Sequence, residues 1–133
     1  MAIFPSITLM TVAGLALLSS VLAIQVIVQR VRLKIESGDG GHQAMAQAIR
    51  AHANFSEHVP IALLALGAYE IAGGQRVLLL ACAGALILAR LLSALGLSRS
   101  LGPSIPRQAG ASITILVTIV CAVAALIRLV PAS

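Results

Sequence analysis

The sequence contains very little charge. Of its 133 residues only 10% are Asp, Glu, Lys or Arg, whereas 59% are hydrophobic, and the mean hydropathy is +1.05. A soluble domain carries about 25% charged residues, and one of this length buries only about two-thirds of its surface. So much apolar surface cannot be hidden from water. The composition therefore excludes a soluble globular enzyme and predicts an integral membrane protein.

Aromatic residues and cysteines are also scarce. There is no tryptophan, and aromatic residues make up 2% of the chain, too few to stack on nucleic-acid bases. The net charge of +5 is therefore not interpreted as a nucleic-acid-binding surface but as a signal of membrane topology. The two cysteines, Cys82 and Cys121, each lie inside an apolar run. Two cysteines are too few for a disulfide scaffold, and both are expected to act as small hydrophobic residues.

Four apolar segments separated by short loops predict four membrane-spanning helices. Residues 1–29 contain no charged residue, and a membrane span needs about 20 apolar residues. A cleaved signal peptide is the alternative for this segment, but the basic region that begins such peptides is missing. Glycine and proline residues break the chain between the other segments. We expect one domain over residues 1–133, an all-α integral membrane four-helix bundle with helices at about 5–30, 43–72, 76–97 and 107–130.

Basic residues concentrate on one side of this predicted bundle. The loops after the first and third segments carry five of them, Arg30, Arg32, Lys34, Arg99 and Arg107. The other side carries only Arg76 and Arg128. Because basic loops stay in the cytoplasm, we expect these loops to be cytoplasmic and both termini to lie across the membrane. In a bacterial inner membrane the termini would be periplasmic.

The second segment carries a stripe of polar residues. They recur at steps of three and four residues and fall within about 100° of helical arc: Gln43, Gln47, Arg50, Asn54 and Glu57, with His58 beside them. One interpretation is a polar seam that fixes helix register through hydrogen bonds. The other is a binding site, since Glu57 lies roughly 22 Å from the Gly73 end of the segment. An ionisable group at that depth in a membrane is a functional-site hypothesis by default.

Arg90, in the third segment, lies at a depth that matches Glu57, about 21 Å beyond Arg76. We hypothesise an ion pair between Arg90 and Glu57, which would offset the desolvation of both charges. Arg50 lies nearer the predicted cytoplasmic end than Glu57, so the stripe would line a cavity that is positive at its opening and acidic deeper in the membrane. Because arginine binds carboxylates and glutamate binds ammonium groups, such a cavity suits a small molecule that carries both.

The histidines do not predict a metal site. His52 lies on the helix face opposite the stripe, and His42, His52 and His58 do not share one face at a spacing typical of metal ligands. No cysteine joins them. We expect no bound metal.

The run from Ala48 to Pro60 resembles the signature of the MAPEG family, the membrane-associated proteins in eicosanoid and glutathione metabolism. The family pattern reads Arg-Ala-x-x-Asn-x-x-Glu-Tyr/His-x-Pro on the second of four helices, and this chain matches it with Arg50, Ala51, Asn54, Glu57, His58 and Pro60. Ala89-Arg90-Leu91 and Arg107 are further matches. The glycines at 38–41 and 73–74 look like those of bacterial members that resemble microsomal glutathione transferases. Tyrosines that follow the third-helix arginine in eicosanoid-making members are absent here.

This resemblance implies a homotrimer embedded in membrane lipids, with glutathione bound as co-substrate between neighbouring subunits. It implies that Arg107 stabilises the glutathione thiolate and that Arg30 reaches the site across the subunit interface, so both are expected to be catalytic. The expected glutathione contacts are Arg50, His52, Asn54, Glu57, His58 and Arg90, of which His52 would reach the ligand of the neighbouring subunit.

The function implied is that of a glutathione-dependent membrane transferase or peroxidase. A thiol titrates near pH 8.5 and only the thiolate attacks, so a fixed cation nearby raises its reactive fraction. The second substrate would be a hydrophobic electrophile or a lipid hydroperoxide. One alternative is a non-catalytic membrane protein of the same fold that binds or presents a lipid-like small molecule. Another is a purely structural or transport-related bundle.

Overall fold

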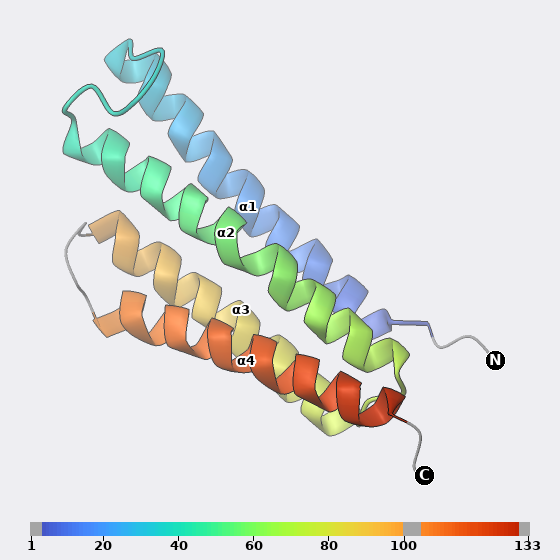
Figure 1. Cartoon of the computed structure of the whole chain (residues 1–133). Helices are drawn as coiled ribbons and strands as arrows, with labels where there is room; N and C mark the ends of the chain where they lie inside the picture. Colours follow the sequence, from blue (N-terminus) through green and yellow to red (C-terminus); the bar gives the residue numbers. More distant parts are fainter. Residues whose placement is uncertain (1–3, 100–104, 131–133) are drawn as a thin grey trace.

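The chain folds as four helices in a computed structural model that describes residues 4–99 and 105–130. The helices are α1 (Ser6–Leu33), α2 (Gln43–Ile71), α3 (Arg76–Arg99) and α4 (Ile105–Leu129). Gly102 and Pro103, expected to break the chain, and the side chain of Arg99 lie outside the described part. Figure 1 shows α1 and α2 side by side, with α3 and α4 beneath them.

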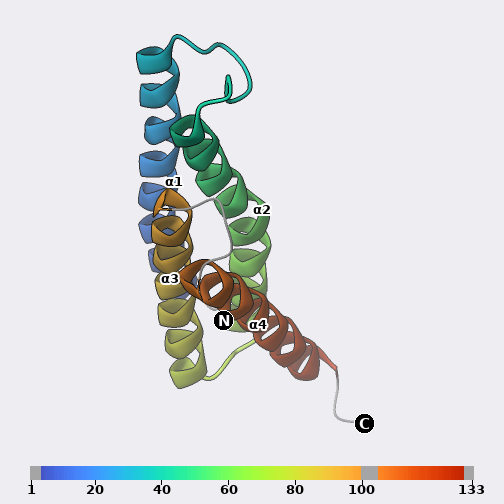
Figure 2. The ribbon, with the colours of Figure 1, turned by 90° about the vertical axis from the view of Figure 1, so that its left-hand side faces the viewer.

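The helix α2 is central to the packing. It contacts all three other helices, whereas α1 contacts α2 and α3. In the perpendicular view α4 crosses α3 at an angle, and the α1–α2 end extends beyond both (Figure 2). Leu66 on α2, Leu86 on α3 and Cys121 on α4 are completely buried where these helices meet.

Three of the four helices are long and apolar enough to cross a membrane: α1, the Arg76–Leu97 part of α3, and α4. Within the described residues α2 is not among them, although at 29 residues it is the longest helix. Its polar stripe and Glu70, near its end, account for the difference. Large apolar side chains such as Leu17, 72% exposed, point away from the bundle, as expected for a surface that faces lipid.

The basic residues predicted for opposite sides of the membrane lie at opposite ends of the bundle. The α1–α2 loop, with Arg30 before it, lies at the same end as the start of α4, where Arg107 stands (Figure 1). The start of α1, the end of α4 and the α2–α3 turn lie at the other end. There Arg128 donates a hydrogen bond from Nη1 to the Gly73 carbonyl, at 2.9 Å.

The α1–α2 loop is held by short-range hydrogen bonds. Nη1 of Arg30 donates to the carbonyls of Glu36 at 3.1 Å and Gly38 at 3.4 Å. The Asp39 carboxylate accepts a bond of 2.9 Å from the Gly41 N–H. Gly40 has φ +58°, a left-handed conformation that glycine adopts more readily than other residues, so this turn favours glycine.

The start of α1 is anchored by a carboxylate from another helix. Glu70, near the end of α2, is only 6% exposed. Its Oε1 accepts a hydrogen bond from the Ile7 N–H at 2.9 Å, and its Oε2 accepts one from the Thr8 N–H at 2.7 Å. The first N–H groups of a helix have no partner within the helix. A negative charge that accepts their bonds also interacts favourably with the helix dipole.

Candidate functional site

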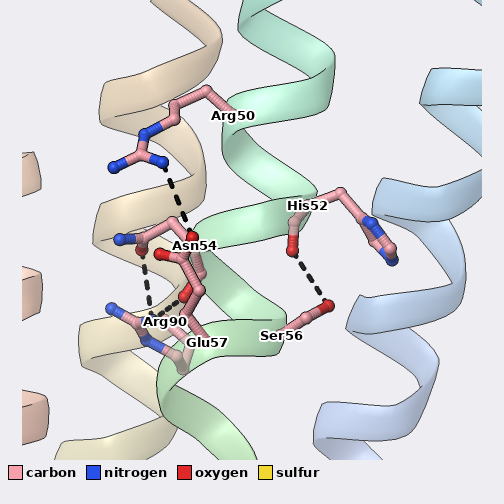
Figure 3. Close-up of polar contacts among 6 residues, drawn as sticks. All are labelled: Arg50, His52, Asn54, Ser56, Glu57 and Arg90. Carbon is pink, nitrogen blue, oxygen red and sulfur yellow. Dashed lines mark hydrogen bonds and ion pairs between the residues drawn. The ribbon is translucent and has the colours of Figure 1, made fainter. Parts of the chain in front are cut away.

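The polar stripe of α2 forms an ion pair on the side of the helix that faces α3. Arg50 Nη1 lies 3.6 Å from Glu57 Oε1, and their side chains are 49% and 51% exposed. Figure 3 shows Arg50, Asn54 and Glu57 on this one face. Exposed ion pairs contribute little to stability. Both groups can therefore exchange their mutual contact for contacts with a ligand.

Arg90 lies behind this face and is only 1% exposed. Its Nη1 donates to the backbone carbonyl and to Oδ1 of Asn54, at 3.4 and 3.3 Å (Figure 3). Its Nη2 donates to Ser93 Oγ at 2.7 Å and to the Gly110 carbonyl at 3.4 Å. Neutral oxygens from α2, α3 and α4 thus disperse its positive charge.

The expected ion pair between Arg90 and Glu57 is therefore wrong. Among the described residues, Glu57 pairs with Arg50, and Arg90 makes no ion pair. The two residues do lie at a similar level of the bundle (Figure 3). The Arg90 guanidinium nevertheless donates to Asn54, which precedes Glu57 by about one turn of α2, and not to Glu57. Depth along a helix places two charges at one level without fixing the direction in which each side chain points.

The helices α3 and α4 pack closely at Gly110. A Cβ on this residue would lie 2.5 Å from the Ala89 carbonyl oxygen and 3.0 Å from the Ser93 backbone nitrogen, and would collide with Ser93 Oγ. The Gly110 carbonyl also accepts a bond of 2.8 Å from Thr114 Oγ1. The backbones of the two helices therefore touch beside the Arg90 guanidinium.

A cavity of about 430 Å³ opens at the basic end of the bundle. It is bounded by the α1–α2 loop, α2 and the first turn of α4, through Gly38, Asp39, Ala46, Ile49, Arg50 and Arg107. Two guanidinium groups and one carboxylate line it, so the cavity favours an anionic ligand. The structure thus brings Arg50 and Arg107, 57 positions apart in the sequence, to one site.

Three expected site residues lie around other cavities or faces. Arg30 lines a separate cavity of about 520 Å³ with Ile27, Val31, Lys34, Ile35 and Glu36. His52 points toward α1, away from the Arg50 face (Figure 3). His58 lines a smaller apolar cavity of about 120 Å³ with Ile61, Thr114, Ile115, Thr118 and Ile119. Within one chain, the side chains of Arg30, His52 and His58 therefore do not line the cavity that contains Arg107.

Sequence reasoning did not identify three residues that shape the site. Ser93 and Gly110 bind the Arg90 guanidinium, and Asp39 lines the cavity with the two arginines. Ser93 and Gly110 each lie one helical turn after a residue that was identified, Arg90 and Arg107. That spacing is the only signal in the sequence, and it does not show which residues face each other across α3 and α4.

Within residues 4–99 and 105–130, no three His, Cys, Asp or Glu side chains lie close enough to hold a metal ion.

A sequence model of the MAPEG family matches residues 8–127, nearly the whole chain. A comparison with curated proteins found no match.

Proposed function

We propose that this chain, which belongs to the MAPEG family, is a glutathione-dependent membrane transferase or peroxidase. The observation that carries the proposal is the cavity that Arg50 and Arg107 line together. Glutathione offers carboxylates, an ammonium group and a thiol. Arg50 suits a carboxylate, and Glu57 suits the ammonium group. Arg107 is the proposed partner of the sulfur.

Arg107 acts in this proposal by stabilising the thiolate. A fixed positive charge lowers the pKa of a nearby thiol and so raises the fraction that can attack. With an electrophile, the sulfur forms a bond to carbon while the leaving group departs with its electron pair, and the thiol proton goes to solvent. With a lipid hydroperoxide, two glutathione molecules are oxidised to the disulfide, and the hydroperoxide is reduced to an alcohol and water.

The thiolate test uses Arg107→Ala with Arg76→Ala as control, because Arg76 is exposed at the opposite end of the bundle. We expect wild type to develop thiolate absorbance on titration with glutathione, and Arg107→Ala to lose it. Conjugation of an electrophilic chloronitroarene should fall about 100-fold in Arg107→Ala, as when one stabilising donor is removed from an enzyme site. Arg76→Ala should match wild type. Full thiolate absorbance in Arg107→Ala would contradict the role of Arg107.

We also propose a homotrimer with glutathione between neighbouring subunits. Arg30 and His52 lie away from the Arg107 cavity within one chain, and a neighbouring copy can supply them. The half-exposed Arg50–Glu57 pair supports this, since charges that face lipid are costly. Native mass spectrometry in detergent should give three times the chain mass of 13.6 kDa. A monomer that turns over glutathione would contradict the proposal that neighbouring subunits share the site.

In the membrane we propose that α2 crosses together with the three apolar helices, because it packs against all of them. The end with the α1–α2 loop would face the cytoplasm of a bacterial cell, and the termini the opposite side. Glutathione would then enter the cavity from the cytoplasm, and the hydrophobic substrate from the lipid.

The alternative is a non-catalytic protein of the same fold that presents a lipid-like molecule. It is favoured by the leucines and Ser93 that stand where eicosanoid-making members carry tyrosines after Arg90, and by the apolar cavity beside His58. Wild type that retained a lipid in native mass spectrometry, but gave no thiolate absorbance with glutathione, would support this alternative.

A further inference from the structure

One buried guanidinium supports the proposed site from behind. Arg90 extends from α3 and donates hydrogen bonds to α2 through Asn54 and to α4 through Gly110. We infer that Arg90 is a positioning residue, which turns the Asn54 carboxamide into a hydrogen-bond donor for the ligand and sets the spacing of α2 and α4. This inference rests on the proposed function, and it removes Arg90 from the expected glutathione contacts.

The first part of the inference concerns the polarity of Asn54. A carboxamide has one acceptor oxygen and one NH₂ group with two donors. Arg90 Nη1 occupies Oδ1 of Asn54 at 3.3 Å. The NH₂ group therefore points away from Arg90, and Figure 3 shows it on the same side as the Arg50 guanidinium. Asn54 thus offers donors beside a cation, and the ligand group that it meets must be an acceptor such as a carboxylate.

The second part concerns the distance between the two helices that carry Arg50 and Arg107. Asn54 lies four residues after Arg50, and Gly110 lies three residues after Arg107, each about one helical turn away. The two backbone carbonyls that Arg90 binds, both at 3.4 Å, therefore belong to the turns that follow the cavity. One rigid planar group ties these turns together, so its loss should let the cavity widen.

Burial separates this role from direct contact with a ligand. Arg90 is 1% exposed, and both of its terminal nitrogens already donate to protein oxygens. A ligand could reach it only after α2 or α4 had moved. Arg50, half exposed on the other side of Asn54, has no such barrier.

The experiment replaces Arg90 by Lys and by Met in the full chain purified in detergent. The same two substitutions at Arg76, exposed at the far end of the same helix, are the matched controls. We expect Arg90→Lys to raise the KM for glutathione about tenfold, as for one lost bond to a charged group, while kcat changes less than about threefold. Arg90→Lys keeps the buried charge, so it remains informative if Arg90→Met fails to fold.

A double-mutant cycle with Asn54→Ala tests the connection between the two side chains. Both substitutions remove the same oriented donor, so Asn54→Ala should raise KM about tenfold in wild type and leave it nearly unchanged in Arg90→Lys. Independent effects that multiply would overturn the inference. A loss of kcat and thiolate absorbance at constant KM in Arg90→Lys would also overturn the inference, because it would indicate direct contact with the ligand. A loss of thermal stability alone would overturn it too, because it would indicate a merely structural role.

A distance measurement separates the inference from the proposed function. Spin labels at Gln43→Cys on α2 and Gln108→Cys on α4 report the spacing without glutathione, in labelled chains diluted with unlabelled ones. Cys82 and Cys121 are buried and should stay unlabelled. Arg90→Met should broaden the distance distribution, and an unchanged distribution would overturn the spacing role. Wild type without thiolate absorbance would instead refute the proposed function and the donor role of Asn54 with it.

Discussion

Replacing Gly110 by alanine is expected to destabilise the protein by about 3 kcal/mol, a fall of about 10 °C in the midpoint of thermal unfolding. The new Cβ would lie 2.5 Å from the Ala89 carbonyl oxygen and 3.0 Å from the Ser93 nitrogen. Both of these are backbone atoms, which cannot rotate away as a side chain can. The helices α3 and α4 must separate to accept the methyl group, and the contacts of Arg90 with Gly110 are stretched in consequence.

Gly84 provides the control for this substitution. It lies on α3, and a Cβ there would have no neighbour within 4 Å. Gly84→Ala should be neutral or stabilise by about 0.5–1 kcal/mol, because alanine favours the helix more than glycine. Adding Ser93→Ala to Gly110→Ala removes the collision with Ser93 Oγ but leaves the Ala89 carbonyl, so it should not restore stability. Equal midpoints for Gly110→Ala and Gly84→Ala would show that the helices do not touch here.

The second large effect is expected at Glu70. Glu70→Ala leaves the N–H groups of Ile7 and Thr8 without the carboxylate that accepts their bonds at 2.9 and 2.7 Å. Each bond to a charged group contributes about 1.5–3 kcal/mol, so we expect a loss of about 3 kcal/mol. Glu70→Gln keeps one acceptor oxygen and should lie between wild type and Glu70→Ala.

Hydrogen exchange locates the effect of Glu70. Amide protons of Ile7 and Thr8 should exchange faster in Glu70→Ala, while those in the centre of α3 remain protected. Glu36→Ala is the control, since Glu36 is exposed in the α1–α2 loop, and it should change stability by less than about 0.5 kcal/mol. Unchanged protection at Ile7 and Thr8 in Glu70→Ala would show that the carboxylate does not hold α1.

The sequence pattern predicts much of the framework. Apolar runs and glycine breaks place the four helices within three residues of the ends that the structure has, because hydrophobic length and turn residues are local properties. The helical period places Arg50, Asn54 and Glu57 on one face for the same reason.

Contacts between distant residues could not be predicted in the same way. Spacing along the helices places both Arg50 and Arg90 near the level of Glu57. The direction in which the Arg90 side chain leaves α3 is not contained in that spacing, and in the structure Glu57 pairs with Arg50. The Glu70 contacts join residues 62 and 63 positions apart. An acidic residue near a helix end suggests an exposed position at the membrane surface, and its burial depends on where the first turn of α1 docks.

The polarity of α2 has a consequence for biosynthesis. This helix is set apart from the three apolar ones because it carries the stripe and Glu70, and each charged residue near a helix centre raises the cost of insertion by about 2.5–3.5 kcal/mol. Alone, α2 is the segment least able to leave the translocon for lipid. If α2 crosses the membrane as proposed above, we expect it to remain in the translocon until α3 follows and the Arg90 contacts with Asn54 form, so that α2 and α3 enter the bilayer together.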